Sequence, residues 1–337
     1  MIQEAIKILA DRANLTAAQM EGVMEEILTG SADTADIVSF LTLLNKKGHT
    51  LEELTTGVRV LRSHVTKINT KHKIVLDTCG TGGDKKGTFN ISTASAFVAS
   101  GVGIAVAKHG NRSVSSCCGS ADILEELGMN INMDRAVIER CLDDIGIAFL
   151  FAQNLHPAMK YAMPARKQLG VKTIFNILGP LANPASATHQ LVGVYEEGLT
   201  DTIARVLNEL GSVHALVVCG RDGLDEVTTT TATRITEVNK TDVKTYEIIP
   251  EDFGIKRTKL ESLIGGDVPG NAKILLEVLN GRPGPARDIV LLNAGAAIYA
   301  ADKVSSINEG IELARESIDS KKALEKLELL KEYSNKK

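Results

Sequence analysis

The clearest chemistry in this 337-residue sequence lies in the stretch 73–93, which reads KIVLDTCGTGGDKKGTFNIST. It begins with apolar residues that end at Asp77, continues through four glycines around Asp84, and closes with Asn-Ile-Ser-Thr before a second apolar stretch. This order predicts a strand, a loop and a helix capped by Ser92 or Thr93. Glycines let backbone amides come close to a ligand, and amides at a helix start stabilise an anion. The glycines alone would equally suit a tight turn, because neither GxxxxGK[ST] nor GxGxxG is present.

A second polar loop follows the next expected strand. The chain turns at 100–103, residues 104–107 predict a strand, and 108–116 reads KHGNRSVSS. A strand–helix–strand order predicts a right-handed parallel unit, and such sheets bind ligands beyond the carboxyl ends of their strands. Both polar loops should therefore meet at one edge of the sheet. An amide-rich loop beside Lys108, Arg112 and three serines suits a polyanionic phosphate ester better than it suits a solvated surface turn.

An adjacent acidic pair, Asp225 and Glu226, should reach the same edge. It follows a predicted strand at 215–219 and a turn at 220–223. Taken alone, such a pair is most often plain surface charge. Among the histidines, only His109 lies in one of the polar loops, and a lone histidine is more often structural than catalytic.

Two kinds of element must position these groups. The first 70 residues predict helices only: capping boxes begin at Thr16 and Thr50, and Gly48 ends a third helix. Amphipathic helices without a local strand must pack on each other, on the rest of the chain or on a partner chain. The segment 64–70 is typical of a linker.

From residue 73 onward, strands and helices alternate. The segment 156–185 returns to helix, broken by prolines at 157, 164, 180 and 184. The predicted fold class is α/β, with a small helical domain at 1–70 and a large α/β domain at 71–337 whose mostly parallel central sheet is flanked by helices. We expect helices at 121–127, 134–145, 200–210, 270–279, 284–301 and from about 306 onward, strands at 147–152 and 191–195, and antiparallel strands within 228–249.

Length and charge bound the function classes. The chain is long enough for one large domain or two moderate ones, and 44% hydrophobic with 24% charged residues is ordinary for a globular protein. A net charge of −4 argues against a nucleic-acid or membrane partner. The N-terminus lacks the layout of a signal peptide, and no apolar run approaches the roughly 20 residues that span a bilayer. Five cysteines without a CxxC pair argue against a disulfide framework, so we expect a cytoplasmic protein.

Several spaced blocks together resemble one enzyme family. They are DTCGTGGD at 77–84, NIST at 90–93, KHGNRSVSS at 108–116, GSAD at 119–122, the long block HPAMKYAMPARKQLGVKTIFNILGPLANPA at 156–185, and the acidic pair. In this order they resemble the anthranilate phosphoribosyltransferase family of tryptophan synthesis, over nearly the whole chain. The sequence departs from the family at Cys117 and Cys118, where polar or small residues are commoner, and at Gln153, where proline is common. Neither departure falls on a position that carries chemistry in the family.

The resemblance implies a reaction and its site residues. The 5-phosphoribosyl group of phosphoribosyl pyrophosphate would pass to the amine of anthranilate, with loss of pyrophosphate. Anthranilate would contact Gly80, Asn111 and Arg166, with His109 lining the acceptor pocket. Phosphoribosyl pyrophosphate would be cradled by Gly80, Gly83, Asp84, Thr88, Asn90, Ile91, Ser92, Thr93, Lys108, His109, Gly110, Asn111, Arg112, Ser113, Val114, Ser115, Ser116 and Ser120.

The resemblance also implies a metal and an assembly. Ser92, Asp225 and Glu226 resemble the family's Mg²⁺ ligands, with two ions per site when substrate is bound, and hard oxygen ligands suit Mg²⁺. Part of 156–185 would rejoin the helical domain across a cleft, and that domain would form a homodimer. The aromatic amine is already neutral, so no general base is assigned, and catalysis would rest on positioning and electrostatics.

Two other functions are compatible with this architecture. A pyrimidine nucleoside phosphorylase shares the helical-plus-α/β fold, but its loop signatures differ from DTCGTGGD and KHGNR. A non-catalytic relative that binds nucleic acid is disfavoured by the net charge of −4 and by the intact acidic pair.

Overall fold

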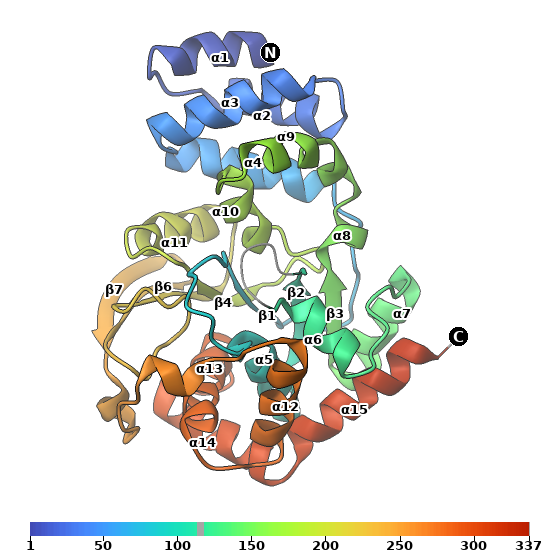
Figure 1. Cartoon of the computed structure of the whole chain (residues 1–337), viewed down its shortest axis with the longest axis vertical. Coiled ribbons are helices and arrows are strands. Elements are labelled where there is room, and N and C mark those ends of the chain that lie inside the picture. Colours follow the sequence, from blue (N-terminus) through green and yellow to red (C-terminus); the bar gives the residue numbers. More distant parts are fainter. Residues whose placement is uncertain (113–117, 337) are drawn as a thin grey trace. The chain divides into compact units, whose positions relative to one another are not determined.

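The computed structural model describes residues 1–112 and 118–336, and the chain divides into two compact units. A helical unit comprises Met1–Lys67 and Gln153–Pro184, and an α/β unit comprises Ile68–Ala152 and Ala185–Lys337. In Figure 1 the green helix α9 lies among the blue helices of the helical unit, where it packs on α3. The helical unit is therefore assembled from two segments that are far apart in the sequence.

The helical unit begins and ends its helices largely where the sequence predicts. Thr16 and Thr50 each accept a hydrogen bond from the backbone three residues on, as capping boxes, and Gly48 ends α3 with a φ of 89°. The prolines at 164 and 180 do not break helices, which corrects the prediction: Pro164 stands in the first turn of α9, where its missing N–H is harmless, and Pro180 lies near the end of α10. The elements are α1 (Ile2–Ala10), α2 (Ala17–Leu28), α3 (Thr34–Lys47), α4 (Leu51–Ser63), α8 (Ala152–Leu155) at the unit boundary, a 3-10 turn (Pro157–Tyr161), α9 (Met163–Leu169) and α10 (Ile174–Leu181).

The α/β unit is built on a seven-stranded sheet in the order β3-β2-β1-β4-β5-β6-β7. The first five of these strands are parallel, and β6 and β7 continue the sheet as an antiparallel hairpin. The predicted α/β class with a mostly parallel sheet is thus confirmed. The strands are β1 (Val75–Gly80), β2 (Ala105–Gly110), β3 (Ile147–Phe151), β4 (His189–Gly193), β5 (His214–Gly220), β6 (Thr233–Asn239) and β7 (Asp242–Ile248).

The order of the strands reverses between β1 and β4. From β1 the chain moves to β2 through α5 (Ile91–Gly101), and from β4 it moves the other way to β5 through α11 (Leu199–Glu209). Right-handed crossovers in opposite directions place α5 and α11 on opposite faces of the sheet (Figure 1). The carboxyl ends of β1 and β4 therefore border the crevice where open α/β sheets bind ligands.

The remaining helices surround this sheet. Helix α13 packs on β4, β5 and α5, and α14 packs on α13. The elements are α6 (Ser120–Glu126), α7 (Arg135–Arg140) continued by a π-helical turn (Cys141–Ile145), 3-10 turns at Pro250–Phe253 and Leu260–Leu263, α12 (Val268–Leu279), α13 (Pro285–Ala300), α14 (Ile307–Asp319) and α15 (Lys322–Asn335).

One sequence prediction is wrong in the C-terminal half. The single helix expected from about 306 is two helices, α14 and α15, separated by Lys321 in the left-handed conformation with a φ of 66°. Gly101 of α5 packs against this break, since a Cβ there would lie 2.1 Å from Ser317 Oγ. The antiparallel strands expected within 228–249 are present as β6 and β7. Residues 228–232 before them lie outside the sheet, and there the Thr228 hydroxyl donates to Asp222.

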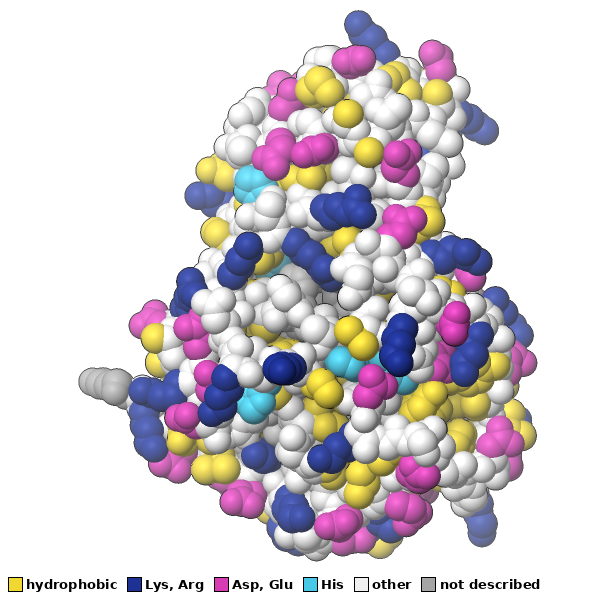
Figure 2. All heavy atoms as spheres, turned by 180° about the vertical axis from the view of Figure 1, so that it is seen from behind, with side chains coloured by type: hydrophobic (Ala, Val, Ile, Leu, Met, Phe, Trp, Pro, Cys, Tyr) yellow, Lys and Arg dark blue, Asp and Glu magenta, His cyan; other side chains and the backbone are white. Residues whose placement is uncertain are grey.

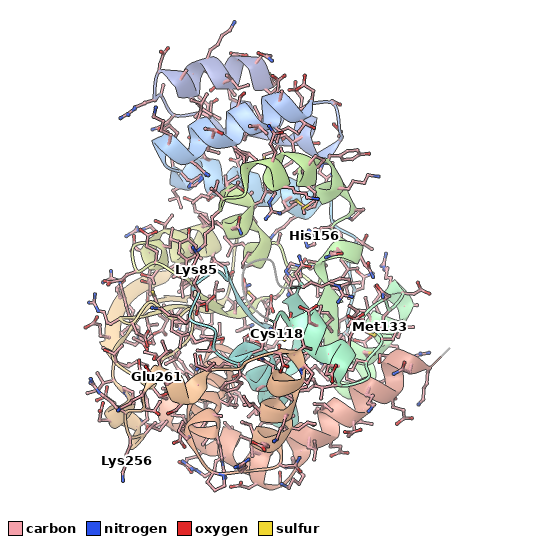
Figure 3. All side chains as sticks on the ribbon, in the orientation of Figure 1. Lys85, Cys118, Met133, His156, Lys256 and Glu261 are labelled. Atoms are coloured by element: carbon pink, nitrogen blue, oxygen red, sulfur yellow. The ribbon has the colours of Figure 1, made fainter. Side chains whose placement is uncertain are left out.

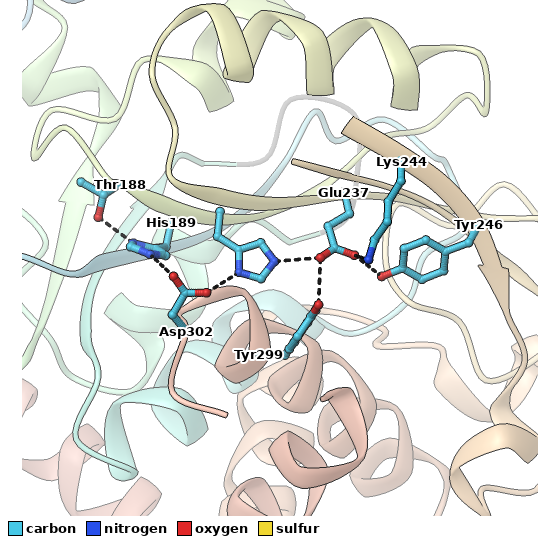
Figure 4. Close-up of polar contacts among 8 residues, drawn as sticks. Thr188, His189, Glu237, Lys244, Tyr246, Tyr299 and Asp302 are labelled. Atoms are coloured by element: carbon cyan, nitrogen blue, oxygen red, sulfur yellow. Dashed lines mark hydrogen bonds and ion pairs between the residues drawn. The ribbon is translucent and has the colours of Figure 1, made fainter. Parts of the chain in front are cut away.

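A network of polar side chains lies at the amino-terminal end of β4 and β5, opposite the carboxyl ends that border the crevice (Figure 4). His214 bridges Asp302 and Glu237: its Nδ1 lies 2.6 Å from Asp302 Oδ1 and its Nε2 lies 3.2 Å from Glu237 Oε1. The hydroxyls of Tyr246 and Tyr299 each donate to Glu237 at 2.8 Å. Because both His214 and Glu237 are buried, this network joins α13, β5 and β6–β7 through charged hydrogen bonds.

The described residues contain no helix that is both long and apolar enough to cross a membrane. On the face seen in Figure 2, acidic and basic side chains are interspersed over the lower part, which is the α/β unit.

Candidate active site

The glycine loop leaves β1 at the reversal point of the sheet. β1 runs to Gly80, which pairs with Gly193 of β4, so the predicted end at Asp77 is three residues too early. Asp77 is buried inside the sheet, where its Oδ1 accepts the His109 amide at 3.0 Å. That hydrogen bond explains how an acidic residue is tolerated in a central strand. In the loop beyond, positive φ values of 63° at Gly82 and 77° at Gly83 require glycine.

The start of α5 faces the same edge, but its cap differs from the prediction. The N-cap is Asn90, whose Oδ1 accepts the Thr93 amide at 3.0 Å and the Ser92 hydroxyl at 3.2 Å. The predicted cap at Ser92 or Thr93 is therefore wrong: both residues lie inside the helix, and the Asn90 side chain accepts the hydrogen bond that a cap accepts. The Thr93 Oγ1 is buried without a hydrogen-bond partner among the described residues, so it is available to an acceptor such as a phosphate oxygen.

Lys108 and His109 belong to a strand and not to the second loop. β2 extends to Gly110, three residues beyond the predicted 104–107. The buried Lys108 Nζ donates to Thr78 O at 2.6 Å and to Ser92 Oγ at 3.2 Å. Burial lowers the pKa of Lys108, against the opposing effect of nearby acidic groups that include Asp77 and Glu226. The lysine thus places a positive charge directly beneath the start of α5.

Arg112 and Asn111, which follow β2, contact α6. The Arg112 guanidinium pairs with Asp122 at 3.0 Å and also with Glu125, and Ser120 Oγ donates to Asn111 O at 3.4 Å. Figure 3 labels Cys118, which lies just before α6, and Lys85 on the glycine loop, where its φ is 58°. The predicted site residues Ser113, Val114, Ser115 and Ser116, and also Cys117, lie outside the described residues.

The acidic pair reaches the same edge from β5. Asp225 Oδ2 accepts the Gly82 amide at 3.1 Å, so the segment after β5 touches the glycine loop after β1. Burial, reinforced by the neighbouring Asp84, raises the pKa of Asp225 to about 7. Burial and the charge of Asp225 raise the pKa of Glu226 well above its usual value, although Lys108 opposes this.

Asp84, Asp225 and Glu226 place negative charge at this edge, and each raises the pKa of a neighbour in the group or has its own pKa raised. Among the described residues, however, no three His, Cys, Asp or Glu side chains come together as a ready metal site, so a divalent cation here would need hydroxyl or substrate oxygens as further ligands. A cation would offset this negative charge, and carboxylate and hydroxyl oxygens are the donors that Mg²⁺ prefers. The Ser92 hydroxyl lies on the neighbouring helix start, where it already contacts Lys108.

Arg166 belongs to the helical unit and was predicted to bind a carboxylate. It lies on α9 with its guanidinium 5.7 Å from the centre of the Phe175 ring, and its Nη1 contacts Met163 Sδ at 3.7 Å. Burial lowers its pKa. Among the residues that the structure describes, no acidic side chain forms an ion pair with it, and its one side-chain hydrogen-bond partner there, Met163, is a neighbour on α9.

Two supporting residues were missed by the sequence reasoning. Asn271 on α12 is buried and its Oδ1 accepts the Asn90 amide at 3.1 Å, so it holds the cap of α5 in place. Close by in the sequence, Thr88 forms an isolated antiparallel β-bridge with Ile264. Gly193 ends β4 under Asp225, and a Cβ there would lie 1.6 Å from Asp225 O. Nothing local marked either residue: Asn271 lies in the predicted helix 270–279 together with the polar Lys273 and Glu277, and Gly193 is a lone glycine at the end of a strand.

Known proteins match the chain over nearly its whole length. Two family models fit it: "Glycosyl transferase family, helical bundle domain" over residues 3–65 and "Glycosyl transferase family, a/b domain" over residues 72–324. The anthranilate phosphoribosyltransferase of Acetivibrio thermocellus is 49% identical over 99% of this chain and 97% of its own length. That of Geotalea uraniireducens is 48% identical over 99% of this chain and 100% of its own.

Solved structures agree with the sequence relatives. The anthranilate phosphoribosyltransferase of Thermus thermophilus superposes with a TM-score of 0.94 at 38% identity, covering 98% of this chain and 99% of that one. The Saccharomyces cerevisiae enzyme in complex with PRPP and Mg gives a TM-score of 0.90 at 29% identity, covering 99% of this chain and 97% of its own. With identities this high over full-length alignments, the chain belongs to the anthranilate phosphoribosyltransferase family.

Proposed function

We propose that this chain transfers the 5-phosphoribosyl group of phosphoribosyl pyrophosphate to the amine of anthranilate. The products are N-(5-phosphoribosyl)anthranilate and pyrophosphate, in the second step of tryptophan synthesis from chorismate. The observation that carries the proposal is the meeting of the glycine loop, the start of α5 and the acidic pair at the reversal point of the sheet. Family membership supports it, since the Saccharomyces cerevisiae relative has structures in complex with PRPP and Mg and in complex with 4-fluoroanthranilate.

The phosphate groups of the substrate are proposed to bind at the start of α5 and the loops beside it. Backbone amides at a helix start and the Thr93 hydroxyl can bond to phosphate oxygens. Lys108, held beneath Ser92, adds a positive charge without needing a surface position. The proposed contacts remain those of the predicted set, namely Gly80, Gly83, Asp84, Thr88, residues 90–93, 108–116 and Ser120.

Ser92, Asp225 and Glu226 are proposed to hold Mg²⁺, with two ions per site once substrate is bound. Mg²⁺ bound there would neutralise charge on the departing pyrophosphate. The residues of the chain do the rest: they hold the sugar and its phosphates in place and keep the acidic pair near the leaving group. Catalysis then depends on orientation and electrostatic stabilisation.

The acceptor is proposed to contact Arg166, Asn111 and Gly80. Anthranilate carries a carboxylate beside its amine, and a guanidinium can meet a carboxylate with two parallel hydrogen bonds. The Arg166 guanidinium is partly buried beside an aromatic ring and a thioether, and within 1–112 and 118–336 no acidic side chain forms an ion pair with it. A carboxylate ligand would supply a counter-charge. The amine needs no general base because its lone pair is free at neutral pH.

Assembly and location are also proposed. The helical unit exposes large apolar side chains at Met1, Tyr161, Met163 and Val171, and covering them in a homodimer would remove apolar surface from water. A cytoplasmic location, with no nucleic-acid or membrane partner, stays a prediction from the sequence.

The proposed reaction is tested by the fluorescence of anthranilate. On mixing the protein with anthranilate, phosphoribosyl pyrophosphate and Mg²⁺, we expect the signal to fall at a rate proportional to enzyme concentration. Omitting the phosphoribosyl donor or adding EDTA should stop the change. A steady signal with all components present would exclude this activity.

A further inference from the structure

A buried asparagine in the middle of α13 has no part in the chemistry above. Asn293 is 0% exposed and stands between Leu292 and Ala294 in a helix whose buried positions are otherwise apolar or small. Asparagine is a weak helix former, and a buried side-chain amide is stable only when its polar atoms have partners. Its presence here therefore needs a specific cause.

The side-chain amide of Asn293 clamps the peptide groups of Val227. The Val227 amide donates to Asn293 Oδ1 at 2.8 Å, and Asn293 Nδ2 donates back to Val227 O at 2.8 Å. The same Nδ2 donates to Ile289 O at 2.9 Å on its own helix. Because an N–H needs an acceptor and the two carbonyls need a donor, these contacts are satisfied by one orientation of the amide.

Val227 directly follows the acidic pair, so the clamp acts on the segment proposed to bind metal. A second constraint on this segment comes from Gly193, above which Asp225 O passes so closely that no Cβ could fit. A third is the hydrogen bond from the Gly82 amide to Asp225 Oδ2. Helix α13, β4 and the glycine loop thus each fix one part of the segment 225–227.

The hydrogen bonds of Asp222 do not replace this clamp. Asp222 accepts the Leu224 amide at 3.0 Å and the Thr228 hydroxyl at 2.8 Å, and these bonds close the loop on itself. They shape the loop but do not attach the acidic pair to the helices beneath. Asn293 makes that attachment from the buried stretch of α13 between Ile289 and Ile298.

We propose that Asn293 is a positioning residue that sets the affinity of Asp225 and Glu226 for their divalent cation. The inference rests on the proposed function, in which that pair holds the metal. Without the side-chain amide of Asn293, the backbone N–H and C=O of the buried Val227 lose their hydrogen-bond partners. The segment 225–227 must then move or admit water. Groups behind metal-ligating side chains typically change metal affinity about 10- to 100-fold when they are removed.

The test compares two Asn293 variants with a control. Asn293→Leu keeps the approximate shape but removes all three hydrogen bonds, and Asn293→Ser leaves room for water and is the milder change. Leu327→Ala removes a buried side chain of α15, an element that contributes no residue to the proposed metal site. It shows how a loss of stability alone changes the Kd for Mn²⁺. Mn²⁺, used as the probe, is titrated calorimetrically in the presence of phosphoribosyl pyrophosphate, and hydrogen exchange of 222–230 is followed without metal.

We expect both Asn293 variants to raise the Kd for Mn²⁺ by about 10- to 100-fold and to speed exchange at the Val227 amide, with the KM for anthranilate unchanged. Leu327→Ala should lower the unfolding temperature and leave the Kd for Mn²⁺ as it is. An unchanged Kd in Asn293→Ser would overturn the positioning role, whether or not Asn293→Leu folds.

The double variant Asp225→Asn, Glu226→Gln separates the inference from the proposed function. If it loses Mn²⁺ binding while both Asn293 variants keep it, the metal site stands and the positioning role is wrong. If the double variant itself binds Mn²⁺ normally, the proposed metal site is wrong and the inference falls with it.

Discussion

Replacing Glu237 by glutamine should destabilise the α/β unit in a strongly pH-dependent way. Burial alone would raise the pKa of Glu237, but hydrogen bonds from His214, Tyr246 and Tyr299 lower it from 4.5 to about 2. At about 1.4 kcal/mol per pKa unit, the native environment stabilises the charged carboxylate by about 3 kcal/mol. Glu237→Gln removes this charge and leaves His214 with one acidic partner, Asp302, which is half exposed.

The pH window follows from the direction of each shift. The pKa of Glu237 is depressed, so its contribution is fully present above about pH 4.5 and is lost as the pH falls toward 2, by about 1.4 kcal/mol per unit. Burial would lower the pKa of His214, but Glu237 and Asp302 raise it overall. The histidine's contribution is therefore complete below about pH 6.5 and is lost as the pH rises through its folded-state pKa. The network stabilises most between about pH 4.5 and 6.5.

Thermal unfolding measured at about pH 5.5 and again near pH 3.5 provides the assay. At the higher pH we expect Glu237→Gln to lower the unfolding midpoint by about 6–12 °C, and at the lower pH the gap between the two proteins should narrow. Glu247→Gln is the matched control, because it makes the same change at an exposed carboxylate of β7 and should cost no more than about 1 kcal/mol. A gap that is equal at both pH values, or no larger than that of the control, would refute the electrostatic reasoning.

The remaining predictions concern the site and the assembly. Replacing both Asp225 and Glu226 by alanine should lower kcat/KM by orders of magnitude while circular dichroism stays native; near-normal turnover in saturating Mg²⁺ would remove the pair from the mechanism. Arg166→Ala should raise the KM for anthranilate by about one to two orders of magnitude, because a hydrogen bond to a charged group contributes about 1.5–3 kcal/mol, and should leave the KM for phosphoribosyl pyrophosphate unchanged. Lys167→Ala is its control, and an equal loss for both substrates would indicate damaged folding instead. Light scattering at micromolar concentration should give the mass of a dimer, and a monomer would exclude the proposed assembly.

The sequence predicted the elements well because their signals are local. Helical periodicity and the capping boxes at Thr16 and Thr50 depend on residues three or four positions apart, and the structure bears them out. The arrival of the glycine loop and the acidic pair at one edge also follows from the rule for parallel strands. The hydrogen bond between the Gly82 amide and Asp225 is the direct result.

The errors in the site arise from contacts between distant segments. The strand β1 continues past Asp77 because its carboxylate bonds to the backbone of β2, which no pattern around residue 77 could show. Lys108 looked like a loop cation, but its Nζ is held by Thr78 and Ser92 from neighbouring elements. The clamp by Asn293 joins positions 66 residues apart. Buried polar residues inside apolar segments were the signal for such contacts, and their partners could be found only in the fold.

The central claim is most directly tested by following both products at once. Phosphorus NMR of the protein mixed with anthranilate, phosphoribosyl pyrophosphate and Mg²⁺ should show pyrophosphate appearing in equal amount with a new phosphoribosyl ester, and neither in the absence of anthranilate. The fluorescence of anthranilate in the same tube should fall in step. Release of pyrophosphate without consumption of anthranilate, or phosphate-dependent cleavage of a pyrimidine nucleoside in place of this reaction, would contradict the account.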